Sequence, residues 1–121
     1  MPEKRILLVE DEAVVRQMLS LVLWGEGYVI DTATTMAEAM ALLDTRSYAL
    51  AIVDWRLPDG GDGLLVADAA AERGAKTMVM SGYLFQMPGG RADRHETLMK
   101  PVRPAEIIDV VIRAIGKAGV S

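Results

Sequence analysis

The sequence predicts an α/β domain with a doubly wound parallel sheet, in which helices cover both faces of the sheet. Short, mainly apolar runs alternate five times with segments whose apolar residues recur at helical spacing. Apolar runs without polar alternation are typical of strands buried on both faces, as in parallel sheets. At 121 residues, 51% of them hydrophobic, the chain has the size and composition of a single domain, which we expect to span residues 1–121.

The first repeat lies between residues 6 and 25. Ile6–Val9 is a continuous apolar run and predicts a buried strand. Asp11 and Glu12 then favour the start of a helix, which Gly25 ends. The apolar residues of this helix are expected to form one buried stripe: Val14, Val15, Met18, Leu19, Val22 and Leu23.

The second and third repeats follow the same order. Tyr28–Ala33 predicts the second strand. Thr35 and Glu38 have the spacing of a capping box, which predicts the start of the second helix. Ala49–Val53 predicts the third strand, and Leu64–Arg73 the third helix.

The last two repeats differ in how regular they are. Thr77–Met80 predicts the fourth strand, but residues 83–90 end in Pro-Gly-Gly, so any fourth helix should be short or irregular. Thr97–Met99 predicts a short fifth strand. Pro104 suits the first turn of the last helix, whose buried face is expected to hold Ile107, Ile108, Val111, Ile112 and Ile115.

The composition argues against several classes of function. A net charge of −4 and a pI of about 4.9 argue against a basic face that binds nucleic acid. No stretch reaches the apolar length of a membrane span, and the first residues lack the apolar core of a signal peptide. The chain has no cysteine, which excludes disulfides and thiolate metal sites. We therefore expect a cytoplasmic protein without membrane insertion or direct nucleic-acid contact.

Polar side chains follow four of the five predicted strands, at the point where each strand ends. They are Glu10 and Asp11 after the first strand, Asp54 after the third, Ser81 after the fourth and Lys100 after the fifth. Since the carboxyl ends of parallel strands meet at one edge of the sheet, where open α/β folds bind ligands, we expect these side chains to converge. The sequence therefore predicts a site for a divalent metal and a phosphoryl group.

The chemistry of such a site requires these residue types. Mg²⁺ prefers oxygen ligands, so Asp11 can ligate it directly and Glu10 through a water. Asp54 could ligate the metal and also act as a nucleophile toward phosphorus. Several carboxylates together repel a phosphoryl donor, which makes the metal a requirement. Lys100 offers a charge for phosphate oxygens, and the Ser81 hydroxyl offers a hydrogen-bond donor. Pro101 after Lys100 favours a cis peptide.

Taken singly, these residues have simpler explanations. An acid pair suits a helix N-terminus, and a lysine is most often a solvated charge. Only their joint occurrence at four strand ends indicates a site. His95, the one histidine, lies in a charged loop and is expected to be exposed rather than catalytic.

The chain resembles the receiver domain of two-component response regulators in four motifs: Glu10-Asp11, Asp54 with Pro58, Ser81-Gly82 and Lys100-Pro101. The resemblance implies a flavodoxin-like fold with strand order 2-1-3-4-5. It also implies phosphotransfer to Asp54 from a histidine kinase or histidine phosphotransfer protein, with a downstream protein partner. Mg²⁺ would be held by Asp11, Asp54 and the backbone carbonyl of Arg56, and Ser81 and Lys100 would contact the phosphoryl group.

The sequence departs from the usual receiver pattern in four places. Glu10 replaces the more common aspartate, and the loop at 60–63 is about one residue longer. Thr97 stands where most receivers carry an aromatic switch residue, and the segment 81–100 is shortened. The last two features resemble a subgroup of single-domain receivers that lack the aromatic switch. The expected switch region then comprises Ser81, Gly82, Tyr83 and Thr97.

Two other functions remain open from the sequence. The first is a degenerate receiver that acts as an interaction module without phosphorylation. The second is a phosphohydrolase that forms an aspartyl phosphate, in which two aspartates flank one residue. Asp54-Trp-Arg56 places an arginine at the second position, which argues against the phosphohydrolase. Beyond self-phosphorylation and autodephosphorylation, no enzymatic activity is expected.

Overall fold

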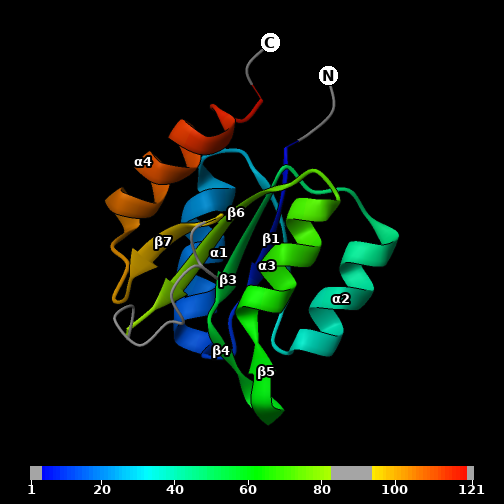
Figure 1. The fold of residues 1–121 in the computed structure, drawn as a ribbon. Helices are drawn as coiled ribbons and strands as arrows, with labels where there is room; N and C mark the ends of the chain where they lie inside the picture. The colour runs from blue at the N-terminus through cyan, green and yellow to red at the C-terminus, as the bar shows by residue number, and fades with distance from the viewer. Residues whose placement is uncertain (1–3, 83–93, 120–121) are drawn as a thin grey trace.

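The computed structural model describes residues 4–82 and 94–119, and shows a five-stranded parallel sheet in the order β2-β1-β3-β6-β7 (Figure 1). Since β6 and β7 are the fourth and fifth strands of this sheet, the order 2-1-3-4-5 is confirmed. The strands are β1 (Arg5–Val9), β2 (Val29–Ala33), β3 (Leu50–Asp54), β6 (Lys76–Ser81) and β7 (Glu96–Met99). The helices of the described chain are α1 (Ala13–Gly25), α2 (Met36–Thr45), α3 (Gly63–Glu72) and α4 (Pro104–Ile115).

Two of the described helices cover each face of the sheet (Figure 1). Successive β1 residues point to opposite faces, so Ile6 and Leu8 pack with α1 and α4, whereas Leu7 and Val9 pack with α2 and α3. All four of these side chains are fully buried. This double burial explains why the strands read as continuous apolar runs, and it confirms the predicted fold class.

The loop after β3 forms a small ribbon that the sequence pattern does not predict. Strand β4 (Arg56–Leu57) pairs antiparallel with β5 (Gly61–Asp62) across a 3₁₀ turn at Pro58–Gly60. Asp59 adopts φ 59°, a left-handed conformation that aspartate tolerates better than most residues. Helix α3 starts directly after the ribbon, one residue before its predicted start.

The start of α2 differs slightly from the predicted capping box. The Thr35 hydroxyl accepts a hydrogen bond from the Glu38 backbone N–H at 3.1 Å, as predicted. The Glu38 carboxylate, however, accepts from the backbone N–H of Thr34 at 2.7 Å and from its hydroxyl at 2.6 Å. These bonds lower the pKa of Glu38, with the Thr34 side chain as the largest cause. The spacing therefore predicts the helix start correctly. The Glu38 carboxylate accepts from the backbone N–H of Thr34, however, and not from that of the N-cap residue Thr35.

Val14 does not join the buried stripe of α1. Leu19 and Leu23 are fully buried, but Val14 is 80% exposed. At 3.6 residues per turn, Val14 lies on the opposite side of the helix from Leu23. The expectation that Val14 belongs to the core is therefore wrong.

His95 is buried, which contradicts the expected exposed position. Its Nε2 lies 2.7 Å from the Asp68 carboxylate on α3, and its Nδ1 lies within hydrogen-bond distance of the Thr77 hydroxyl on β6. Since a carboxylate only accepts, Nε2 carries the hydrogen of this bond, and in a neutral ring Nδ1 accepts from Thr77. Arg94 also pairs with Asp68 at 2.9 Å. Burial raises the pKa of Asp68, but the bonds from His95 and Arg94 outweigh it and lower the pKa.

The expected short or irregular fourth helix falls at residues 83–93, outside the described part of the chain. Within the described residues, no helix combines the length and the apolar character needed to cross a membrane.

Candidate functional site

The predicted site residues converge at the carboxyl edge of the sheet. Asp54 and Ser81 are the last residues of β3 and β6, and Lys100 directly follows β7. Glu10 follows β1, and its backbone N–H still donates to Ala33 of β2 at 3.0 Å, which keeps it in line with the sheet. A pocket of about 360 Å³ opens here, lined by Asp11, Glu12, Asp54, Arg56, Ser81, Gly82 and Lys100.

Three carboxylates lie together at one side of this pocket. Glu10, Asp11 and Asp54 each place an oxygen within 4.8 Å of the other two. Glu10 is fully buried and Asp54 is 8% exposed, whereas Asp11 is exposed. Burial removes the water that would otherwise separate such charges, so the cluster requires a positive partner.

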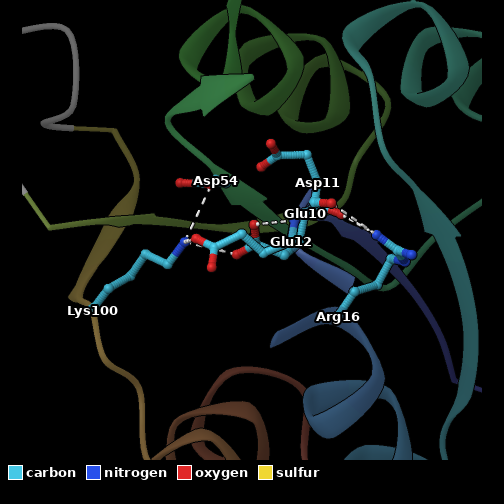
Figure 2. Close-up of polar contacts among 6 residues, drawn as sticks. All are labelled: Glu10, Asp11, Glu12, Arg16, Asp54 and Lys100. Carbon is cyan, nitrogen blue, oxygen red and sulfur yellow. Dashed lines mark hydrogen bonds and ion pairs between the residues drawn. The ribbon is translucent and has the colours of Figure 1, made fainter. Parts of the chain in front are cut away.

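Lys100 supplies positive charge within the protein. Its Nζ donates to Glu10 Oε1 at 2.8 Å and to Asp54 Oδ2 at 3.2 Å (Figure 2). Its backbone N–H donates to the Ser81 carbonyl at 3.0 Å, and the predicted cis peptide between Lys100 and Pro101 is present. The lysine thus joins the ends of β1, β3 and β6.

The electrostatics of the site depend on its burial. The pKa of Asp54 is raised to about 7, mainly by burial and further by the charge of Glu10, with a partial offset by Lys100. Burial alone would lower the pKa of Lys100, but its bond to Glu10 and the charge of Asp54 outweigh this and raise it. A single lysine therefore does not fully compensate the carboxylates, and Asp54 accepts a proton near neutral pH.

We predict that Asp54→Asn stabilises the metal-free protein at pH 8 but not at pH 4. Because the folded-state pKa of Asp54 is raised above its unfolded value near 4, the folded state binds an extra proton between these pH values, and ionisation increasingly opposes folding as pH rises through this window. Asparagine does not ionise, so we expect about 1–3 kcal/mol of added stability at pH 8.

Urea unfolding in the presence of a chelator, at several pH values, would measure this difference. A gain that stays constant from pH 4 to pH 8 would contradict the proposed electrostatic cause. Added Mg²⁺ should reduce the difference, because a ligand of the native wild-type protein stabilises it.

Glu10, the glutamate in place of the common aspartate, uses both of its carboxylate oxygens. Oε1 accepts from Lys100, and Oε2 accepts from the backbone N–H of Glu12 at 3.2 Å. Arg16 donates to the backbone carbonyls of Glu10 and Asp11 at 3.0 and 3.2 Å, which holds this turn in place. The sequence reasoning missed Arg16 because nothing in a local pattern assigns a helix arginine to these carbonyls.

Gly63 brings α3 directly against the residue that ends β3. A Cβ at Gly63 would lie 2.0 Å from the Asp54 carbonyl oxygen, and the Gly63 N–H donates to Trp55 at 2.6 Å. No side chain fits this contact without movement of the backbone that carries Asp54. Position 63, at the end of the long glycine-rich loop, therefore requires glycine.

We predict that Gly63→Ala destabilises the protein by about 2 kcal/mol or more and also disturbs the Asp54 site. Gly25→Ala is the matched control, since a Cβ there meets nothing within 4 Å and alanine favours a helix. Thermal unfolding of both variants would measure the difference. Equal stability of the two variants would show that α3 can shift without cost.

The other predicted site residues have different surroundings. Arg56 lines the pocket with an exposed side chain, and its Cζ lies 4.9 Å from the centre of the Trp55 ring. Gly82 also lines the pocket. Thr97 lies exposed on β7, and Tyr83 falls outside the described residues. The metal role of the Arg56 carbonyl and the switch role of Ser81 and Thr97 remain predictions.

The residues present suit Mg²⁺. The carboxylates of Glu10, Asp11 and Asp54 offer hard oxygen ligands within 4.8 Å of one another, and two of them are buried. The pocket beside them is large enough for a hydrated ion together with a phosphoryl group. Within the described chain, the cluster of Glu10, Asp11 and Asp54 is the group of acids that could hold a metal.

The fold and the site together define the class of protein. The family of response regulator receiver domains matches residues 6–112, and the chain belongs to this family. It is therefore a signalling domain of two-component systems. Among curated relatives, the transcriptional regulatory protein ResD of Bacillus subtilis is 32% identical over 110 residues, which cover 88% of this chain and 45% of ResD. The chain thus spans about half the length of the curated relatives it matches.

Solved structures agree with this assignment. The response regulator TrrA of Thermotoga maritima, in complex with Mg²⁺ and BeF, has a TM-score of 0.81 and 32% identity, covering 92% of this chain and 98% of TrrA. TrrA in complex with the histidine kinase ThkA has a TM-score of 0.79 and 31% identity, covering 93% and 98%. The flavodoxin-like receiver fold is confirmed.

Proposed function

We propose that residues 1–121 form one cytoplasmic receiver domain that accepts a phosphoryl group on Asp54, with Mg²⁺, and signals to a protein partner by a conformational change. The observation that carries this proposal is the position of Asp54. Its carboxylate lies buried at the end of β3, 3.2 Å from the Lys100 ammonium and beside two further carboxylates. Within the described chain, no other aspartate belongs to this acidic cluster at a pocket except Asp11, which is exposed.

The proposed transfer is a displacement at phosphorus. A carboxylate oxygen of Asp54 attacks, a P–O bond forms, and the P–N bond to the donor histidine breaks, leaving its electron pair on the imidazole nitrogen. Lys100 leaves Glu10 and Asp54 to pair with the phosphoryl oxygens, and the Ser81 hydroxyl donates to one of them. Asp11, Asp54, the Arg56 carbonyl and, through a water, Glu10 would hold Mg²⁺, which when bound neutralises charge between donor and acceptor.

The proposed phosphoryl donor is a histidine kinase or a histidine phosphotransfer protein. Support comes from TrrA, a 31% identical receiver whose structure was solved with the histidine kinase ThkA. The output is expected to be a protein contact, because a net charge of −4 argues against a basic face that binds nucleic acid.

One observation favours a second candidate, an interaction module that works without phosphorylation. Thr97 is exposed on β7, and no aromatic residue occurs in that strand to report a movement of Ser81. The intact pairing of Asp54 with Lys100 argues against this alternative, since a module without phosphotransfer has no need of a buried charge cluster.

Incubation with acetyl phosphate and Mg²⁺ tests the proposal. We expect the intact mass to increase by one phosphoryl group, and hydroxylamine to remove it, as for an acyl phosphate. A chelator should prevent the gain. Continuous hydrolysis of acetyl phosphate without a detectable phosphoprotein would indicate a phosphohydrolase, and no reaction at all would favour the interaction module.

A further inference from the structure

Lys100 has a third carboxylate neighbour, Glu12, which has no role in the proposed phosphoryl transfer. Glu12 Oε1 lies 3.6 Å from Lys100 Nζ (Figure 2). The Glu12 side chain is 64% exposed. Glu12 lines the pocket but is not part of the acidic cluster of Glu10, Asp11 and Asp54. It therefore contacts the lysine without taking part in the proposed metal site.

We propose that Glu12 is a positioning residue that competes with the phosphoryl group for Lys100 and thereby weakens the phosphorylated state. This inference rests on the proposed phosphorylation of Asp54. Once Asp54 carries a phosphoryl group and Glu10 serves the cation, Glu12 is the carboxylate that stays available to Lys100. The Lys100 ammonium then pairs with Glu12 as well as with the phosphoryl oxygens, and its interaction with the phosphoryl oxygens is weaker as a result.

The local structure suits Glu12 to this role. Glu12 is the N-cap residue of α1, yet its side chain accepts no capping bond from the helix. Its backbone N–H donates to Glu10 Oε2 at 3.2 Å, which fixes the main chain while the side chain extends toward Lys100. The carboxylate is therefore free to follow the lysine, and replacing it does not remove a helix cap.

The expected effect is modest because Glu12, one member of the pair, is exposed to solvent. Exposed ion pairs contribute little, so removing the Glu12 charge should strengthen binding of a phosphoryl group about two- to fivefold. High salt should reduce the effect, because dissolved ions screen the attraction between charges that solvent can reach.

Beryllofluoride, a phosphoryl mimic, allows a direct test at saturating Mg²⁺. Saturation matters because loss of a negative charge would also weaken metal binding. We expect Glu12→Gln to bind beryllofluoride about two- to fivefold more tightly than the wild type. Glu26→Gln is the matched control: it removes the same charge from an exposed residue at the other end of α1 and should leave affinity unchanged.

A double-mutant cycle with Lys100→Met tests whether the effect passes through the lysine. The gain from Glu12→Gln should disappear in the Lys100→Met background. If that background does not fold, the comparison of Glu12→Gln with Glu26→Gln at low and high salt still tests the inference. Equal affinities of Glu12→Gln and Glu26→Gln, or a gain that persists without Lys100, would overturn the inference while the phosphorylation of Asp54 stands. A wild-type protein that binds no beryllofluoride would overturn both.

Discussion

Asp54→Asn should abolish phosphorylation by acetyl phosphate. The amide is a poor nucleophile toward phosphorus and a weaker metal ligand than a carboxylate, so both proposed functions of Asp54 are lost. The change conserves the shape of the side chain, and the protein should remain folded, because asparagine removes a buried negative charge whose pKa is raised by burial and by the charge of Glu10. Intact-mass measurement over time would show the loss directly.

Asp59→Asn is the matched control for this experiment. Asp59 is exposed in the turn between β4 and β5 and has φ 59°, a conformation that asparagine also adopts readily. It should be phosphorylated at the wild-type rate. Phosphorylation of Asp54→Asn at that rate would mean that another residue is the acceptor and that the site is wrongly assigned.

Asp11→Ala should weaken Mg²⁺ binding by roughly tenfold or more, because it removes a carboxylate that we expect to ligate the ion directly. Glu10→Gln should weaken binding less, since the proposed contact is through a water and the amide keeps an oxygen. Isothermal titration calorimetry of the two variants and the wild type would rank these affinities.

Asp109→Ala provides the control for charge in this series. Asp109 is exposed on α4, away from the pocket, so its removal changes the net charge by the same amount without touching the site. Its Mg²⁺ affinity should match that of the wild type. If Asp11→Ala binds Mg²⁺ as tightly as Asp109→Ala, the metal does not lie beside Asp11.

The sequence could predict the edge at which the site forms, because the hydrophobic pattern locates each strand and Asp54, Ser81 and Lys100 follow strand ends. The contacts within the site are harder to predict. Glu10 and Lys100 are 90 residues apart, and no local pattern specifies their bond. A periodic pattern reports which face of an element is buried, and it carries no signal for such pairings.

The burial of His95 also depends on a residue far away in the sequence, which a local pattern does not predict. Its charged neighbours along the chain suggest an exposed loop, whereas its partner Asp68 is 27 residues away on α3. Burial of a histidine depends on partners that satisfy its ring nitrogens, and these partners come from tertiary structure. The β4–β5 ribbon was missed for a related reason, since its strands have only two residues each and too few positions for a pattern.

The hydrogen bonds of His95 to Asp68 and Thr77 also affect how readily the sheet could pair with a second molecule. Strand β7 is an edge of the sheet, and an edge strand offers unpaired backbone groups to other chains. The buried His95 is hydrogen-bonded to Asp68 just before Glu96–Met99, and Pro101, which has no backbone N–H, follows just after it, so this edge strand is short in the described chain. At the opposite edge, β2 carries the charged Asp31 at its centre. Both edges are therefore poor templates for the sheet of a second molecule, which favours a domain that meets its partners through side chains.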